Sequence, residues 1–179
     1  MDKAVLAAFA HHGIESRLHN GQNSLIHGTP DWYLDSYRHS LREVADRYGL
    51  TEENCPTHPS NCDESWIARD LRKGVVYFIL ERESEAVGCI AMEFPDTDTC
   101  ELERLAVLPE CRKNGFGKAL VDHVIQQAST RRCRKVALGI IAQNGELKRW
   151  YESLGFIETK TVAFPRLPFN VTFMERSVC

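Results

Sequence analysis

From residue 75 onward the chain alternates short β-rich runs with helical periods, and this pattern limits the fold more than any other feature. Runs rich in β-branched and aromatic residues predict strands, and apolar residues that recur every three or four positions predict helices. The expected order is β-β-β-α-β-α-β-β, over residues 75–81, 86–94, 99–107, 116–131, 135–141, 144–154, 156–164 and 171–176. This order predicts an α/β (α+β) fold with a mixed, mostly antiparallel sheet flanked by helices.

The first 74 residues are mainly helix and loop in their pattern. A short strand is expected near residues 14–18, and Asp63 or Ser65 is expected to begin the last helix before Gly74. The predicted helices cover residues 2–12, 32–48 and the short stretch that ends near Gly74.

The composition is that of a folded globular domain. The chain has 179 residues, of which 43% are hydrophobic and 26% charged, so a disordered tail, a collagen and a coiled-coil rod are excluded. The longest apolar runs, 75–80 and 136–141, are far shorter than the roughly 20 residues that span a bilayer. Without a signal-peptide pattern, we expect a cytoplasmic protein with no membrane contact. A net charge of −3 gives no general attraction to nucleic acid, so none is expected as a partner.

The segment between the expected strand 99–107 and the expected helix 116–131 carries the chemistry. It contains Arg112-Lys-Asn-Gly-Phe-Gly-Lys118, in which two glycines allow close backbone approach. The first turn of the helix adds unpaired N–H groups and the positive end of a dipole. These features predict a cradle for an anion such as pyrophosphate; the alternative is a plain turn with solvated cations. A dinucleotide fingerprint is excluded because position 120 is Leu.

Two stretches resemble the GCN5-related N-acetyltransferase (GNAT) superfamily. Residues 105–120 are similar to the family's loop, whose core pattern is Arg/Gln-x-x-Gly-x-Gly/Ala. Residues 144–156 are similar to the family's helix with Asn followed by Tyr-x-x-x-Gly-Phe. The resemblance covers about residues 75–176 and implies an acetyl-CoA-dependent N-acetyltransferase.

The resemblance also implies a division of the chain. Residues 1–30 would form a helical N-terminal extension, and residues 31–179 would form the acetyltransferase domain. Within that domain, 31–74 would supply substrate-side helices and 75–176 the acetyl-CoA-binding core.

In the family, the strand 99–107 splays from the next strand and acetyl-CoA lies in the V between them. Backbone groups near Leu105 and Val107 would then pair with the pantetheine arm and polarise the thioester carbonyl. The N–H groups of residues 112–118 would hold the pyrophosphate, and Asn144 would hydrogen-bond the pantetheine arm. The implied cofactor-binding residues are Leu105, Ala106, Val107, Arg112, Lys113, Asn114, Gly115, Phe116, Gly117, Lys118 and Asn144.

Direct attack of an amine on the thioester needs a base for the amine proton and a proton for the leaving thiolate. Glu101 and Glu103 are the base candidates, because residues two apart on a strand share a face. Their mutual repulsion would raise one pKa; the alternative is a pair of solvated carboxylates facing Arg104 or Arg82. Tyr151 is the acid candidate because a phenol stays protonated at neutral pH, and the alternative is a tyrosine of the core.

Two further groups have both an active and a structural interpretation, and His123 has only a structural one. Cys55, His58 and Cys62 could hold zinc, but no fourth ligand is evident, so no metal is expected and an ordinary loop is favoured. His123 is placed near the surface of its helix. Residues 131–135 could approach the adenosine 3′-phosphate, although a solvated helix end is favoured.

The expected acceptor is a primary amine of a small molecule, with a protein amine as an alternative. The first 70 residues have an acidic excess and several aromatic side chains, which suits a cationic molecule. The expected acceptor pocket combines Trp32, Tyr33, Tyr37 and Trp66 with the loop 165–168. Two other functions remain open: transfer from a different acyl-CoA, and a CoA-binding module without catalysis. A homodimer is possible from the family resemblance.

Overall fold

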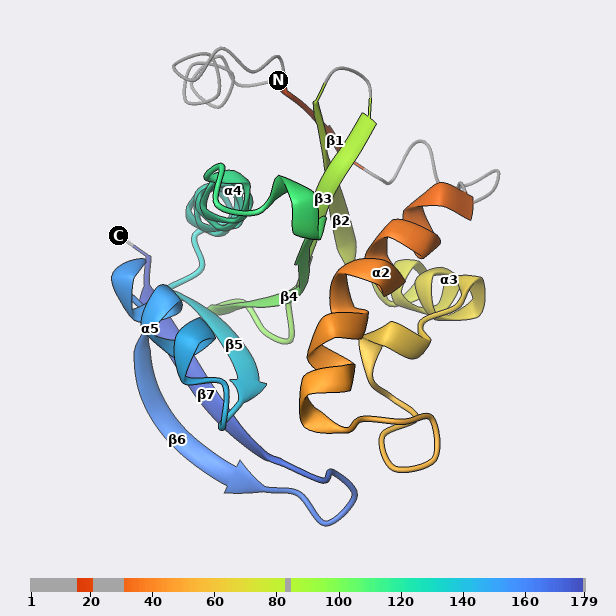
Figure 1. The fold of residues 1–179 in the computed structure, drawn as a ribbon. Helices are drawn as coiled ribbons and strands as arrows, with labels where there is room; N and C mark the ends of the chain where they lie inside the picture. Colours follow the sequence, from red (N-terminus) through yellow and green to blue (C-terminus); the bar gives the residue numbers. More distant parts are fainter. Residues whose placement is uncertain (1–15, 21–30, 83–84, 179) are drawn as a thin grey trace.

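The structure is a computed structural model that describes residues 16–20, 31–82 and 85–178 (Figure 1). Its strands are β1 Ser16–Asn20, β2 Val76–Arg82, β3 Glu85–Glu93, β4 Thr99–Val107, β5 Lys135–Ile141, β6 Ile157–Ala163 and β7 Asn170–Ser177. Its α-helices are α2 Asp31–Tyr48, α3 Glu64–Lys73, α4 Phe116–Thr130 and α5 Gly145–Ser153. The helix predicted over residues 2–12 lies outside the described residues. None of the described helices is both long enough and apolar enough to span a membrane.

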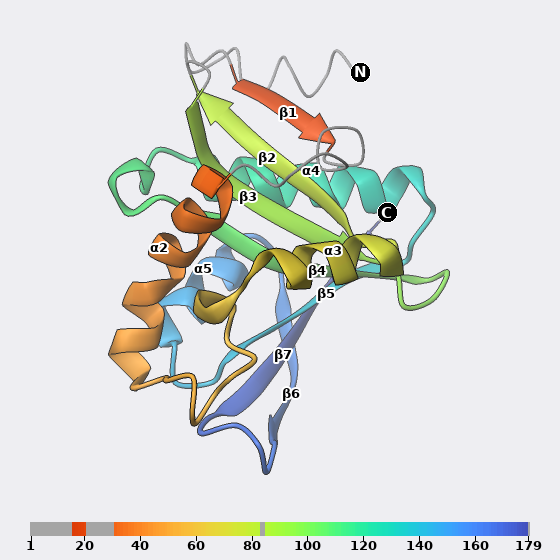
Figure 2. The same cartoon turned by 90° about the vertical axis from the view of Figure 1, so that its right-hand side faces the viewer.

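Within the described residues the strands form one seven-stranded sheet in the order β1-β2-β3-β4-β5-β7-β6. β4 and β5 are parallel, and the other neighbouring strands are antiparallel. Helices α4 and α5 cover one face of the sheet, and α2 and α3 cover the other (Figures 1 and 2). The predicted fold class, a mixed and mostly antiparallel sheet flanked by helices, is therefore confirmed.

Helix ends in the first half of the domain follow from local chemistry. The Asp63 carboxylate accepts the N–H of Trp66 at 3.0 Å and so begins α3. Gly74, at a φ of 90°, ends it, because glycine adopts the left-handed conformation without steric cost. Asp63 is one of the two predicted starts of this helix, and Gly74 is its predicted end.

β4 and β5 diverge soon after they begin. Their register contains three pairs, the last of which joins Glu101 to Ala137. Beyond that point β4 stays paired with β3 as far as Val107, while β5 stays paired with β7 as far as Ile141. The strands therefore separate along their second halves, as the resemblance implies, and the backbone edges that face each other there are left for another group.

His123 corrects one expectation, because it is buried with only 8% of its surface exposed. It lies on α4 beside the apolar stripe, and its ring meets Phe78 edge-on at 4.4 Å between centroids. The face of the sheet is wide enough to cover the flank of α4 as well as its apolar stripe. Among the described residues, neither ring nitrogen has a hydrogen-bond partner. Burial lowers the pKa of His123 below its ordinary value.

Candidate active site

The loop that leads into α4 is held by its own side chains. The Asn114 amide donates to the carbonyl oxygens of Cys111 and Arg112, at 3.1 and 3.2 Å. Lys113 and Gly115 have φ angles of 64° and 82°, so the chain turns sharply before Phe116. No side chain of the described residues caps α4, and the first N–H groups of a helix have no acceptor within it. The loop therefore presents main-chain donors at the positive end of a helix dipole, which is the arrangement that binds anions.

Gly117 brings this loop close to α5. A Cβ atom at Gly117 would lie 3.3 Å from Cζ2 of Trp150, which is tighter than an ordinary contact. Glycine therefore lets the first turn of α4 approach the helix that carries Tyr151.

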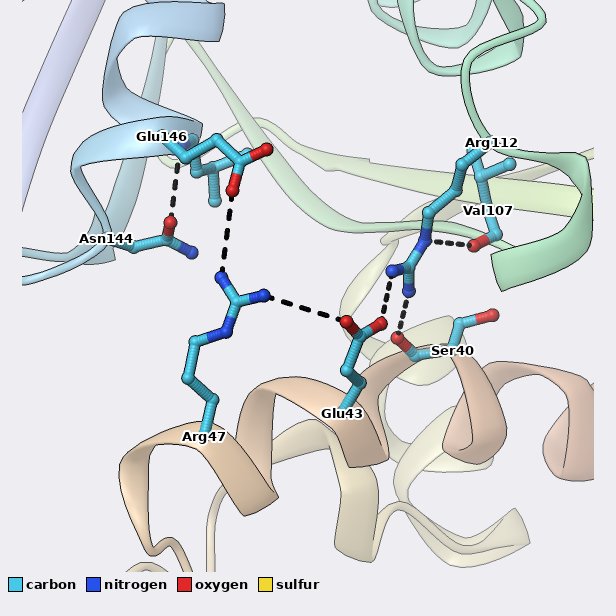
Figure 3. A network of polar contacts seen from close by, with 8 residues as sticks. Ser40, Glu43, Arg47, Val107, Arg112, Asn144 and Glu146 are labelled. Carbon is cyan, nitrogen blue, oxygen red and sulfur yellow. Dashed lines mark hydrogen bonds and ion pairs between the residues drawn. The ribbon is translucent and has the colours of Figure 1, made fainter.

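Arg112 uses its side chain to fasten the loop to α2 (Figure 3). Its Nε donates to the carbonyl of Val107 at 3.2 Å, and its Nη2 donates to the carbonyl of Ser40 at 2.8 Å. Its Nη1 forms an ion pair with Glu43. The hydrogen bond and charge of Arg112 hold the pKa of the Glu43 carboxyl below its ordinary value. The motif predicted a cofactor-binding residue here, and it contained no signal for the contact with α2.

The polar contacts continue from α2 to α5 (Figure 3). Arg47 lies 3.6 Å from Glu43 and 3.8 Å from Glu146, with all three side chains largely exposed. Exposed ion pairs of this kind contribute little to stability. Asn144 begins α5, because its Oδ1 accepts the N–H of Leu147 at 3.2 Å. Its amide nitrogen has no hydrogen-bond partner among the described residues, so it remains available to a ligand.

Glu103 lies on the face of the sheet that α2 and α3 cover. Its partner across β3 is Ala91, which belongs to the core on that side. Glu101, two residues earlier, faces Glu93 across the same pair of strands. Burial raises the pKa of the Glu103 carboxyl, Arg104 opposes this rise, and the negative charges of Glu93 and Glu101 add to it. The predicted repulsion between the two candidate bases is therefore part of the electrostatics of this face.

Tyr151 lies in the core of the opposite face and is 4% exposed. Its ring meets Trp150 and Phe156 edge-on, at 4.8 and 5.4 Å between centroids. Burial raises the pKa of its phenol, so the hydroxyl is protonated at neutral pH. No described residue accepts or donates a hydrogen bond at this hydroxyl. The structure thus places the acid candidate and the base candidates on different faces, with the diverging strands β4 and β5 between them.

The expected acceptor side is only partly as predicted. Tyr37 is a core residue and is 2% exposed, so its ring does not line an open pocket. Trp66 is half-buried, and the guanidinium carbons of Arg69 and Arg104 lie 5.7 and 5.9 Å from its ring centroid. The side chains of Trp32 and Tyr33 lie outside the described residues.

The loop between β6 and β7, which the acceptor prediction includes, adjoins the end of α2. Leu167 and Phe169 of this loop pack against the cluster of Ala45, Leu50 and Cys55. The loop and α2 therefore border the same end of the molecule.

The other candidate groups have structural tasks. The Nδ1 of His58 accepts the N–H of Ser60 at 3.2 Å and caps a short 3-10 turn. In the described part of the chain, no group of three or more His, Cys, Asp or Glu could hold a metal ion. Arg131 lies over the ring of Phe94 at 4.3 Å, and Lys135 pairs with Glu175 at 2.9 Å. These residues follow the far end of the 15-residue helix α4, ~22 Å from the loop at 1.5 Å per residue, which fits the solvated helix end.

Sequence reasoning missed the ion pair between Arg104 and Asp70. Arg104 Nη2 lies 2.6 Å from Asp70 Oδ2, and both side chains are largely buried. Arg104 also has a φ of 55°, which is unusual for a residue with a Cβ. The one available signal was a charged residue directly after Glu103 in a strand that is otherwise half-buried.

The profile of the family described as Acetyltransferase (GNAT) family matches residues 31–156. The chain belongs to the GNAT acetyltransferase family. As a GNAT protein it is an acyltransferase. An Escherichia coli protein named uncharacterized N-acetyltransferase YjgM is 31% identical over 120 residues, which cover 65% of this chain and 71% of the relative.

A second relative agrees with this assignment, and a solved structure has a similar fold. An uncharacterized N-acetyltransferase of Schizosaccharomyces pombe is 28% identical over 149 residues, which cover 79% of this chain and 86% of the relative. The fold is similar to the crystal structure of a GNAT family acetyltransferase from Elizabethkingia anophelis with acetyl-CoA bound. The TM-score is 0.63 at 18% sequence identity, over 90% of this chain and 97% of that chain.

Proposed function

We propose that this GNAT protein transfers the acetyl group of acetyl-CoA to a primary amine by direct attack. The observation that carries the proposal is the divergence of β4 and β5 beyond Glu101 and Ala137. It leaves strand edges free between an uncapped helix start on one side and a face with several carboxylates on the other. The similar fold from Elizabethkingia anophelis was solved with acetyl-CoA bound. This arrangement supports the proposed division of the chain into substrate-side helices over 31–74 and an acetyl-CoA-binding core over 75–176.

The residues that would hold acetyl-CoA fit its parts. Main-chain donors of residues 113–118, with the charge of Lys113, suit a diphosphate. The backbone of Leu105, Ala106 and Val107 would bind the pantetheine arm along β4, and the amide nitrogen of Asn144 would bind it from α5. Arg112 would add positive charge beside the diphosphate while its side chain holds α2.

In the proposed reaction the nitrogen of the acceptor attacks the thioester carbon and the carbon–sulfur bond breaks. Glu103 takes one proton from the ammonium form of the acceptor, directly or through one water, and this gives the nitrogen the lone pair that attacks. The second proton leaves the nitrogen as the amide forms and balances the proton that the departing sulfur receives. Glu101 adds negative charge that favours a cationic acceptor. The Tyr151 hydroxyl donates to the sulfur that leaves, since burial keeps this phenol protonated.

The proposed acceptor is a cationic amine. Support comes from the carboxylates of Glu93, Glu101 and Glu103, which share the face covered by α2 and α3. Opposite charge raises the local concentration of such a substrate. We place the reaction in the cytoplasm.

The test is turnover of acetyl-CoA, propionyl-CoA and succinyl-CoA against a panel of polyamines, amino sugars, amino acids and peptides with free amino groups. The proposal predicts acetyl transfer to at least one cationic amine, with release of free CoA. Loss of most kcat in Glu103→Gln is expected, because no base then takes the proton. Binding of CoA without turnover of any donor on the panel would instead support a CoA-binding module without catalysis. Faster transfer from propionyl-CoA or succinyl-CoA than from acetyl-CoA would show that the acyl donor is not acetyl-CoA.

A further inference from the structure

β4 contains one more residue than the stretch of β3 that it pairs with. Ala91 pairs with Glu103 and Cys89 pairs with Ala106, so one residue of β3 faces two of β4. This is a β-bulge, and bulges re-aim side chains. Arg104 lies in it with a φ of 55°. As a result, Arg104 reaches the same α2 and α3 side as Glu103, where it meets Asp70 and Trp66.

Buried contacts hold the bulge in place. Arg104 Nη2 lies 2.6 Å from Asp70 Oδ2, and the Tyr77 hydroxyl donates to the same oxygen at 2.6 Å. The Arg104 side chain is 15% exposed and that of Asp70 is 8% exposed. The bulge in β4 is thereby anchored to α3 and β2. A charge pair of this kind is costly to break, because one partner would be left buried and uncompensated.

Arg104 also lies beside Glu103 without forming a hydrogen bond to its carboxylate oxygens. The distance from Arg104 Nε to Glu103 Oε2 is 3.9 Å, which is too long for a hydrogen bond. Nε is buried and has no hydrogen-bond partner among the described residues. Glu103 is 37% exposed and so meets both this positive charge and solvent. Its carboxylate oxygens therefore remain available to accept a proton.

The other groups around Glu103 favour its protonation. Burial raises its pKa, and the carboxylates of Glu93 on β3, Glu101 on β4 and Asp70 on α3 raise it further. Arg104 is the positive charge that opposes them. The phenols that face Arg104, Tyr37 of α2 and Tyr77 of β2, stay neutral because burial raises their pKa values. The protonation of Glu103 thus depends on the balance between the positive charge of Arg104 and the negative charge of its ion-pair partner Asp70.

We propose that Arg104 is a positioning residue that keeps Glu103 ionised beside the acceptor, and that Asp70 limits how much of the Arg104 charge reaches Glu103. The inference rests on the proposed function, in which Glu103 is the base. It assigns to the buried pair a role in setting the pH range of the reaction in addition to its role in the fold.

The test is the pH dependence of kcat/KM in Arg104→Gln and Asp70→Asn. Loss of the Arg104 charge raises the pKa of Glu103. The acidic limb of the profile, where kcat/KM falls because Glu103 becomes protonated, therefore moves to higher pH by about one unit. Loss of the Asp70 charge lowers that pKa and frees the guanidinium, so the limb moves to lower pH. Arg104→Lys, which keeps the charge, is expected to restore most of the wild-type profile. Opposite shifts support the proposal, whereas an unmoved limb in both variants, or shifts in one direction, overturn it.

A second measurement keeps the proposal testable if Arg104→Gln does not fold. The Glu103 carboxyl is followed by carbon NMR through a pH titration of the wild type, Asp70→Asn and Tyr77→Phe, with Glu103→Gln used to assign its signal. The midpoint is expected to fall in Asp70→Asn and to stay in place in Tyr77→Phe, which removes a hydrogen bond but no charge. An unchanged or raised midpoint in Asp70→Asn overturns the proposal. Wild-type kcat in Glu103→Gln would instead refute the base assignment, and the titration would still report the effect of Asp70.

Discussion

Asn144 shows how one side chain can serve both the fold and a ligand. Its oxygen accepts the N–H of Leu147 and so begins α5, while its amide nitrogen remains without a partner among the described residues. A carboxamide allows this because its acceptor and its donors are separate atoms. The proposed contact with the pantetheine arm and the helix cap are therefore compatible.

Replacement of Tyr151 by Phe tests the acid. The ring contacts with Trp150 and Phe156 are kept, so the fold is expected to survive. Without the hydroxyl, the departing sulfur has no donor, and kcat is expected to fall roughly 100-fold. The Kd for acetyl-CoA is expected to change little. Tyr48→Phe, on α2, is the matched control, and a kcat in Tyr151→Phe equal to that of this control would remove Tyr151 from the mechanism.

The burial of His123 predicts that the folded protein loses stability in weak acid. Its pKa is lowered by burial in the folded chain, whereas the unfolded chain has an ordinary value of about 6.5. The unfolded state therefore binds more protons below about pH 6.5, and folding stability falls as the pH drops. His123→Leu is expected to reduce this fall, by up to about 1.4 kcal/mol per pH unit. Urea unfolding at pH 7 and pH 5 measures it.

His39 supplies the control for this experiment, because it lies on α2 and is exposed. His39→Leu is expected to retain the wild-type dependence on pH. Equal pH dependence of the wild type and His123→Leu would contradict the account of the buried ring.

At the scale of elements, the contact between α2 and the loop before α4 rests on Arg112. Its guanidinium binds the carbonyls of Val107 and Ser40 as well as Glu43. One side chain thus joins the end of β4, helix α2 and the loop before α4.

Arg112→Met and Glu43→Gln separate the two tasks of Arg112. Arg112→Met removes charge from the proposed diphosphate site, so the KM for acetyl-CoA is expected to rise roughly 10-fold, equivalent to about 1.4 kcal/mol. Glu43→Gln breaks a half-exposed ion pair and is expected to lower stability by less than about 1 kcal/mol, with the KM nearly unchanged. Steady-state kinetics and thermal unfolding measure both. An unchanged KM in Arg112→Met would show that its side chain only holds α2.

A substitution at Gly88 on β3 tests how closely β4 approaches β3. A Cβ atom there would lie 2.9 Å from the carbonyl oxygen of Ala106, a main-chain atom that cannot yield easily. Gly88→Ala is expected to lower the free energy of unfolding by about 1–3 kcal/mol. Gly145→Ala is the control, since its nearest neighbour at 3.5 Å is the end of the flexible Arg149 side chain. Equal stability of the two variants would contradict the contact.

At the scale of the molecule, strands were more predictable than contacts. The bounds of β4 and β5 follow from their β-rich runs, and their divergence follows from the family resemblance. The ion pair between Arg104 and Asp70 could not be predicted from the sequence, because it joins β4 to α3 through a bulge that no local pattern reveals. His123 was placed at the surface because helical period describes a stripe and does not describe the width of the sheet beneath it.

We propose that the start of α4 and the separated strands β4 and β5 bind CoA. Calorimetric titration of the purified protein with CoA, and with pantetheine, which lacks the diphosphate, examines this binding without any acceptor. We expect a single CoA site with a Kd in the range of typical enzyme KM values, between about 1 µM and about 1 mM, and much weaker binding of pantetheine. Absence of binding at millimolar CoA, or equal affinity for pantetheine, would contradict it.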